Sequence, residues 1–263
     1  MGKFDGILLC SDFDMTMGIG GVVTDGNCEA IRYFQENGGR FTIISGRHPL
    51  YLQSHQNGFR VNAPLVGYNG ALILDEVTGE ALYSGGRQDM LALDLAEQLW
   101  REYPALRCVV MHDRTTRSLT CFRGVREDCV RSIDALRERC EMPLYNVLCT
   151  AATAEEAAHL LHRLRALAPP VFEIARSWDM GVEIICTEDV KGAAAQRLKR
   201  MLGAELLVTV GDYENDITML QMADISYAVE NALPHVKAAA KRETVHYRDS
   251  AIAAIVAELE RER

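Results

Sequence analysis

Long apolar runs are missing from this 263-residue sequence, which has no stretch near the about eighteen residues that a membrane-spanning helix needs. The first residues, MGKFDGILLCSD, lack the extended apolar segment of a secretory signal. Position 6 is glycine, where an N-myristoylation signal requires serine or threonine. We therefore expect a cytoplasmic protein that has no membrane partner.

Paired-cysteine motifs and basic clusters are also missing. None of the eight cysteines forms a C-x-x-C pair, which argues against a zinc cluster, and a chain of this length can bury a core without disulfides. The 28 lysines and arginines are outnumbered by 37 acidic residues and form no basic block, so we expect no nucleic-acid partner. An anion bound by a chain of net charge −9 would need a local cation or backbone N–H donors.

Strand patterns alternate with a helix pattern in the first part of the chain. GILLCSD (6–12) and RFTIISGR (40–47) have the apolar character of buried strands, and NCEAIRYFQENGG (27–39) between them is amphipathic with a helical period. This spacing predicts a βαβ unit with parallel strands. APLVGYNGA (63–71) is expected to form a third strand, and a hairpin with its turn at Thr78-Gly79 follows.

A different pattern occupies residues 86–186. Its order is α-β-β-α-β-α-β-β, with one helix expected over REDCVRSIDALRERC (126–140), and it predicts a separate α+β module with an antiparallel sheet. The alternating α/β pattern then resumes. We therefore expect a discontinuous α/β core of residues 1–85 and 187–263, with the module inserted between its two parts.

Two aspartates follow the first strand in ILLCSDFDMT. Asp12 and Asp14 could act as nucleophile and general acid/base, or share a hard divalent cation. The ordinary alternative is a helix cap followed by a solvated acid. A carboxylate at the buried end of a strand is unfavourable unless something pairs with it.

Three further short polar segments lie where a predicted strand or helix begins or ends: Ser45-Gly46-Arg47, Lys191-Gly192, and GDYEND (211–216). Each by itself could be a solvated turn or a surface lysine. The carboxyl ends of parallel strands meet at one edge of a sheet, so we expect these polar segments to lie close together. Several carboxylates brought together repel one another unless a cation lies among them, which makes Mg²⁺ the natural companion.

The order D-x-D-x-T, S-G-R, K-G and G-D-x-x-N-D resembles the haloacid dehalogenase-like (HAD) hydrolase superfamily. VGYNGA (66–71), VEIICTEDVKG (182–192) and the order of the inserted module resemble its Cof-type sugar-phosphatase subfamily, which has a type 2 (C2B) cap. The resemblance covers essentially the whole chain. It implies an α/β fold with a Rossmann-like parallel-sheet core and an inserted α+β cap that sets substrate specificity.

The resemblance also implies catalytic roles. Asp12 would attack phosphorus to form an aspartyl-phosphate, and Asp14 would protonate the leaving alcohol and later deprotonate water. Ser45 and Lys191 would bind the transferring phosphoryl oxygens. Further phosphate contacts would come from the side chain of Asn215 and the backbone N–H groups of Phe13 and Gly46.

A metal site is implied at the same place. Mg²⁺ would be held by the carboxylates of Asp12 and Asp212 and by the backbone carbonyl of Asp14, with Asp216 supporting this shell. Thr16 would hold the loop. The sequence departs from the family at Met15, where relatives commonly have glycine, and at Ser45, which replaces the more frequent threonine.

Substrate would be read by the cap. Trp178 is the leading candidate because an exposed indole can stack on a sugar face. Arg47 could reach a second charge on the substrate, or be an ordinary surface arginine. Other polar residues of the cap turns are weaker candidates and could equally be solvated: His112, Asp113, Arg114, Arg117, Arg176, Ser177 and Asp179.

These observations predict a Mg²⁺-dependent phosphatase that acts on small phosphorylated metabolites such as sugar phosphates. A phosphomutase of the phosphomannomutase type and a non-catalytic ligand-sensing HAD protein are the alternatives. We expect a monomer or a homodimer.

Overall fold

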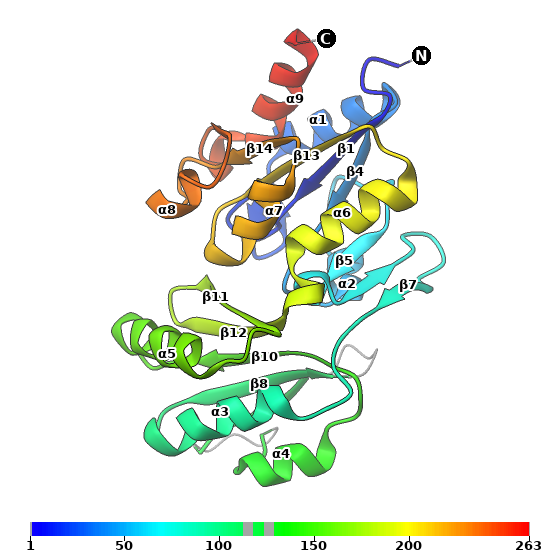
Figure 1. Ribbon diagram of the computed structural model, residues 1–263. Coiled ribbons are helices and arrows are strands. Elements are labelled where there is room, and N and C mark those ends of the chain that lie inside the picture. Colours follow the sequence, from blue (N-terminus) through cyan, green and yellow to red (C-terminus); the bar gives the residue numbers. More distant parts are fainter. Residues whose placement is uncertain (1, 113–117, 124–128, 263) are drawn as a thin grey trace. The chain divides into compact units, whose positions relative to one another are not determined.

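The computed structural model describes residues 2–112, 118–123 and 129–262. The chain divides into two compact units (Figure 1). The first contains Met1–Tyr83 and Lys191–Arg263, and the second is Ser84–Val190. In the part of the chain that the structure describes, no helix combines the length and apolar character needed to cross a membrane.

Five parallel strands form the central sheet of the first unit. In chain order they are β1 (Ile7–Ser11), β4 (Arg40–Ile43), β13 (Leu206–Gly211), β14 (Ile225–Ala228) and β15 (Arg242–Glu243). Their order across the sheet is β15-β14-β13-β1-β4. Because Ser11 is level with Val210 and Ile43, the residues that follow β1, β13 and β4 meet at one edge.

Helices pack on both faces of this sheet. They are α1 (Asp25–Glu36), α2 (Pro49–Ser54), α6 (Lys191–Leu202), α7 (Ile217–Met222), α8 (Pro234–Lys237) and α9 (Ala251–Arg261), with short 3₁₀ turns η1 (Tyr68–Gly70), η3 (Glu214–Asp216) and η4 (Tyr247–Asp249). Ile7 and Leu9 of β1 join the core cluster that contains α1 and α9, whereas Leu8 and Cys10 join the cluster that contains α6. This alternation along one buried strand is the doubly wound arrangement that the sequence predicts.

The expected third strand forms as β5 (Leu65–Gly67), and it lies outside the five-stranded sheet. It pairs antiparallel with β6 (Leu72–Leu74) in a separate sheet that also contains β7 (Ala81–Ser84), and a parallel bridge between Ile44 and Val66 joins it to the chain after β4. The cause is local. Tyr68 and Asn69 adopt positive φ angles of 52° and 60°, so the chain reverses directly after β5. A small hairpin of β2 (Gly18–Ile19) and β3 (Val22–Val23) follows β1.

The second unit contains an antiparallel sheet of order β11-β12-β10-β8-β9. In chain order its strands are β8 (Arg107–His112), β9 (Ser118–Cys121), β10 (Leu144–Thr150), β11 (Phe172–Trp178) and β12 (Gly181–Cys186), and its helices are α3 (Leu91–Glu102), α4 (Ile133–Arg139) and α5 (Ala154–Leu167), followed by the 3₁₀ turn η2 (Thr187–Asp189). All three helices share one core with alternate strand residues such as Cys108, Cys149 and Val182. They therefore lie on one face of the sheet.

Two helix starts differ from expectation, and capping explains both. Helix α1 begins at Asp25 because the hydroxyl of Thr24 accepts the Asn27 N–H at 3.3 Å. Helix α4 begins at Ile133, where Ser132 caps the N–H of Ala135, so the expected helix from residue 126 is too long within the described residues.

Candidate active site

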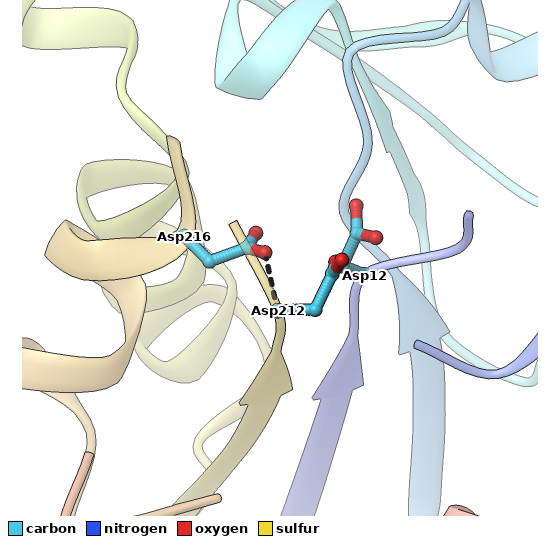
Figure 2. A group of neighbouring side chains, drawn as sticks. All are labelled: Asp12, Asp212 and Asp216. Carbon is cyan, nitrogen blue, oxygen red and sulfur yellow. Dashed lines mark hydrogen bonds between the residues drawn. The ribbon is translucent and has the colours of Figure 1, made fainter. Parts of the chain in front are cut away.

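Three buried carboxylates meet at the edge where β1 and β13 end. Asp12 follows β1, Asp212 follows β13, and Asp216 closes η3. One oxygen from each lies within 4.8 Å of the others, and Figure 2 shows the three side chains directed into the same space. Asp12 and the GDYEND segment therefore lie close together because β1 and β13 are neighbouring parallel strands in register.

The GDYEND loop folds around Asp216. Its Oδ2 accepts the backbone N–H groups of Asp212 at 2.9 Å and of Tyr213 at 3.1 Å (Figure 2 marks the first). A Cβ atom on Gly211 would lie 2.5 Å from the Cβ of Asp216, so only glycine allows this close return of the loop.

Lys191 provides the cation of the cluster. It is the first residue of α6, its side chain is buried, and its Nζ lies 2.6 Å from Oδ1 of Asp12 and 2.6 Å from Oδ1 of Asp216. Burial alone would lower the pKa of the Lys191 ammonium, but the two carboxylates outweigh this effect and raise the pKa above its usual range. The lysine is therefore a fixed positive charge.

One lysine does not neutralise three carboxylates. Burial, opposed by Lys191 and reinforced by Asp216, raises the pKa of Asp12 to about 7. Burial together with the charges of Asp12 and Asp216 raises the pKa of Asp212 to about 8. The cluster is thus short of positive charge and offers only oxygen ligands, the donor set that a hard divalent cation such as Mg²⁺ prefers.

Asp14 is held by Arg47 in a two-pronged ion pair. The Arg47 Nε donates to Oδ2 at 2.5 Å and Nη2 donates to Oδ1 at 3.1 Å. The guanidinium also lies over the ring of Tyr51, 4.5 Å from its centroid. The sequence left two roles open for Arg47, contact with a substrate charge and an ordinary surface position; in this structure its guanidinium pairs with Asp14.

In the loop between Asp14 and β2, Met15 adopts a left-handed backbone conformation. Met15 has a φ of 63°, its N–H donates to the carbonyl of Gly18 at 2.7 Å, and its own carbonyl accepts from Asn231 at 2.9 Å. Met15 is 37% exposed. Thr16 is buried and donates to Oδ1 of Asp212 at 3.0 Å, which connects this loop to the carboxylate cluster.

Ser45 and Asn215 are linked through a residue to which sequence reasoning gave no role. Asn69 donates its backbone N–H to the carbonyl of Ser45 at 2.9 Å, and its side-chain oxygen accepts from Asn215 at 3.0 Å. Ser45 Oγ accepts the Arg47 N–H at 3.3 Å. The available signal for Asn69 was its place in VGYNGA, since asparagine is among the few residues that tolerate a positive φ.

The sequence profile of the haloacid dehalogenase-like hydrolases matches residues 9–256. The chain belongs to this family. The resemblance drawn from its motifs is thereby confirmed, and the relatives below are proteins to which this HAD-like hydrolase is similar.

One curated relative is a protein from Haemophilus influenzae that is named as a predicted phosphatase. It is 26% identical over 236 residues, which are 87% of this chain and 88% of the relative. A phosphoglycolate phosphatase of Sulfurisphaera tokodaii is 41% identical over only 63 residues, which are 23% of this chain and 28% of that relative.

Among solved structures, a HAD subclass IIB sugar phosphatase has a TM-score of 0.76 at 19% identity. The match covers 95% of this chain and 98% of that one. This likeness concerns the fold, and it confirms the predicted Rossmann-like HAD core with an inserted α+β unit.

The predicted substrate readers of this HAD-like hydrolase belong to the second unit. Trp178 ends β11 and is 37% exposed. His112 is buried and its Nδ1 accepts the Glu141 N–H at 3.1 Å, a structural contact that sequence did not foresee. Arg176, Ser177 and Asp179 lie in or beside the same hairpin, while Asp113, Arg114 and Arg117 lie outside the described residues.

Proposed function

We propose that this HAD-like hydrolase is a Mg²⁺-dependent phosphatase that hydrolyses small phosphomonoesters through an aspartyl-phosphate. One observation carries the proposal: Asp12, the candidate nucleophile, lies 2.6 Å from the Lys191 ammonium within a buried set of carboxylates. A nucleophile, a fixed cation and an oxygen-only donor set are the parts that phosphoryl transfer to a carboxylate needs.

The chemistry would proceed in two displacements. In the first, an Asp12 oxygen bonds to phosphorus as the ester P–O bond breaks, and Asp14 gives a proton to the departing alkoxide. In the second, Asp14 takes a proton from water, the water oxygen bonds to phosphorus, and the Asp12–phosphorus bond breaks to release phosphate. Lys191 would offset the charge that develops on the phosphoryl oxygens.

Anion binding would be completed by neutral donors. We assign this role to the hydroxyl of Ser45, the amide of Asn215 and the backbone N–H groups of Phe13 and Gly46. The Asn69 contacts support the assignment, since they tie Ser45 to Asn215.

The carboxylates of Asp12 and Asp212 and the backbone carbonyl of Asp14 would hold Mg²⁺, with Asp216 as a supporting carboxylate. Bound there, the ion would supply positive charge and orient the phosphate. Burial and the neighbouring carboxylates raise the pKa values of Asp12 and Asp212, and this supports the assignment because a bound cation would stabilise the charged forms that burial disfavours.

We further propose that the second unit is a cap that selects the substrate, with Trp178 among its contacts. Sugar phosphates are the favoured class. Support comes from a fold shared with a subclass IIB sugar phosphatase and from relatives that carry phosphatase names.

Phosphate release from p-nitrophenyl phosphate, measured with and without Mg²⁺, tests the proposal. We expect release that depends on Mg²⁺ and stops after chelation. A panel of sugar phosphates then separates the alternatives: an isomeric sugar phosphate formed without free phosphate would indicate a mutase, and no turnover with either kind of substrate would indicate a sensor.

A further inference from the structure

Three flat side chains stack beside α2, at positions four residues apart. Arg47 precedes the helix, Tyr51 lies within it, and His55 is its C-cap. The Tyr51 and His55 rings are stacked, with centroids 3.8 Å apart and planes inclined by 20°. The Arg47 guanidinium lies 4.5 Å from the centroid of the Tyr51 ring. These three side chains are called the α2 stack below.

One end of the α2 stack holds Asp14. Arg47 donates to both carboxylate oxygens of Asp14, but this ion pair is open to water, since the two side chains are 41% and 33% exposed. An exposed ion pair is weak by itself because water competes for it and a long side chain has many conformations. The contact with Tyr51 restricts the plane of the guanidinium, and it thereby restricts the position of the Asp14 carboxylate.

The other end of the α2 stack contacts the β2–β3 hairpin. A Cβ atom on Gly21, in the turn of that hairpin, would lie 2.7 Å from Cδ2 of His55, so the imidazole packs directly against the Gly21 backbone. The Nδ1 atom of His55 lies 2.8 Å from the carbonyl oxygen of Tyr51 and 2.9 Å from Oγ of Ser54. These contacts fix the orientation of the His55 ring between Tyr51 and the hairpin.

The backbone connects Asp14 to the same hairpin. Asp14 and Gly18 form a β-bridge, and the Met15 N–H donates to the carbonyl of Gly18 at 2.7 Å. The contacts therefore form a closed ring that runs from Asp14 through the α2 stack to the hairpin and returns along the backbone. Asp14 is held by its side chain and by its main chain at once.

We propose that Tyr51 and His55 are positioning residues, which act through Arg47 to hold Asp14 in place for proton transfer to the leaving group. The inference rests on the proposed phosphatase reaction, in which Asp14 is the general acid, and it adds two residues to that reaction. Tyr51 and His55 have no contact with the reacting atoms in this scheme. The loss of either ring should therefore matter most for leaving groups that need a proton.

Two aryl phosphates of similar shape distinguish this role from a contribution to stability. Phenolate is a stronger base than p-nitrophenolate, so phenyl phosphate depends more on the proton from Asp14. Tyr51→Leu should lower kcat/KM for phenyl phosphate about three- to fivefold, the size of one partly exposed cation–π contact, and change kcat/KM for p-nitrophenyl phosphate less than about twofold. Tyr51→Phe keeps the ring and should restore kcat/KM. His55→Leu should cause a smaller loss in the same direction.

A double variant tests whether Tyr51 acts through Arg47. If it does, Arg47→Met with Tyr51→Leu should be no slower with phenyl phosphate than Arg47→Met alone. Tyr33→Leu is the matched control, because Tyr33 is a partly buried tyrosine of the same unit and also lies beneath a cation, the Lys3 ammonium at 5.5 Å. It should leave kcat/KM near normal with both substrates.

Hydrogen exchange at Nε of Arg47 measures the same contact without any substrate. In ¹⁵N-labelled protein the Nε–H signal of Arg47 is identified by its loss in Arg47→Met. We expect this proton to exchange with water at least about threefold faster in Tyr51→Leu than in the unaltered chain or in Tyr33→Leu. His55→Leu provides the same comparison if Tyr51→Leu does not fold.

Three results would overturn the proposal. They are an equal loss of kcat/KM with both aryl phosphates, a further loss when Tyr51→Leu is added to Arg47→Met, and an Arg47 Nε–H exchange rate that Tyr51→Leu leaves unchanged. An unaltered chain that releases no phosphate from p-nitrophenyl phosphate with Mg²⁺ would instead refute the proposed hydrolysis, and the exchange measurement would still decide whether Tyr51 holds Arg47.

Discussion

Lys191 and Asp12 form a buried ion pair at 2.6 Å, and the same ammonium lies 2.6 Å from Asp216. The pair joins the two separate segments of the first unit. Asp12 belongs to the segment before the second unit, and Lys191 begins the segment that follows it. Removing one partner of such a pair leaves an uncompensated buried charge, so both stability and chemistry depend on Lys191.

Replacing Lys191 with methionine should lower kcat/KM for p-nitrophenyl phosphate by about 100- to 1,000-fold, the usual cost of losing one transition-state charge partner. Lys199→Met is the matched control because Lys199 lies on the same helix and pairs with Asp224 at the surface. It should retain near-normal turnover. A folded Lys191→Met protein with unchanged kcat/KM would show that this lysine does not touch the phosphate.

The Arg47–Asp14 pair makes a prediction about leaving groups. If Arg47 positions Asp14 as the proton donor, Arg47→Met should reduce kcat/KM about tenfold for an alkyl or sugar phosphate, since kcat/KM reports the first displacement. It should affect kcat/KM for p-nitrophenyl phosphate much less, because p-nitrophenolate departs without a proton. Asp14→Asn should show the same asymmetry in kcat/KM more strongly, and it should also lower kcat for both substrates because Asp14 takes the proton from water in the second displacement. A rise in KM with unchanged kcat would instead indicate that Arg47 reads a substrate charge.

Metal binding should depend on pH. The pKa values of about 7 for Asp12 and about 8 for Asp212 lie above the ordinary 3.8. Between pH 3.8 and about pH 8 the folded metal-free chain therefore binds more protons at these two carboxylates than the unfolded chain does. Its stability should therefore fall as pH rises through that range. Mg²⁺ competes with those protons and should raise Tm more at about pH 8.5 than at about pH 6.

Thermal melts with and without MgCl₂ at the two pH values measure this effect. Asp212→Asn, which removes one proposed ligand, should lose most of the Mg²⁺ increment. An equal increment at both pH values, or one that Asp212→Asn leaves unchanged, would contradict the proposed metal site.

Thr16 offers a test of loop positioning. Thr16→Val removes the hydroxyl that donates to Asp212 at 3.0 Å and should reduce kcat/KM about tenfold. Thr42 is an equally buried threonine of the same unit, whose hydroxyl donates to the carbonyl of Pro64 at 2.6 Å. Thr42→Val should therefore lower Tm by a similar amount while leaving kcat/KM near normal. If both variants lost kcat/KM equally, Thr16 would contribute to the stability of the fold and not specifically to the positioning of Asp212.

Much of the candidate site could be predicted because several of its residues directly follow a strand of the parallel sheet. Asp12 and Asp212 follow neighbouring parallel strands whose apolar runs are plain in the sequence, and parallel strands bring their carboxyl ends together. Lys191 could be placed as the first residue of a helix that enters the same unit. These positions follow from backbone periodicity and topology.

The contacts that could not be predicted depend on side-chain reach and local backbone. The Arg47 side chain is long enough to reach several acidic groups. Its pairing with Asp14 therefore could not be predicted from the sequence and is seen only in the structure. Asn69 and the reversal after β5 depend on positive φ angles at two consecutive residues that are not glycine. Apolar periodicity carries no signal for that geometry, so the sequence predicts strand β5 and does not predict its antiparallel pairing with β6.

The most direct measurement is chemical trapping of the intermediate. The protein is mixed with a phosphomonoester and Mg²⁺, quenched in acid, and treated with borohydride, which reduces an aspartyl-phosphate to homoserine. Peptide mass spectrometry should then find homoserine at position 12, and only when substrate is present. Continued phosphate release with aspartate unchanged at position 12, or with homoserine at position 14 instead, would contradict the role of Asp12 as the nucleophile.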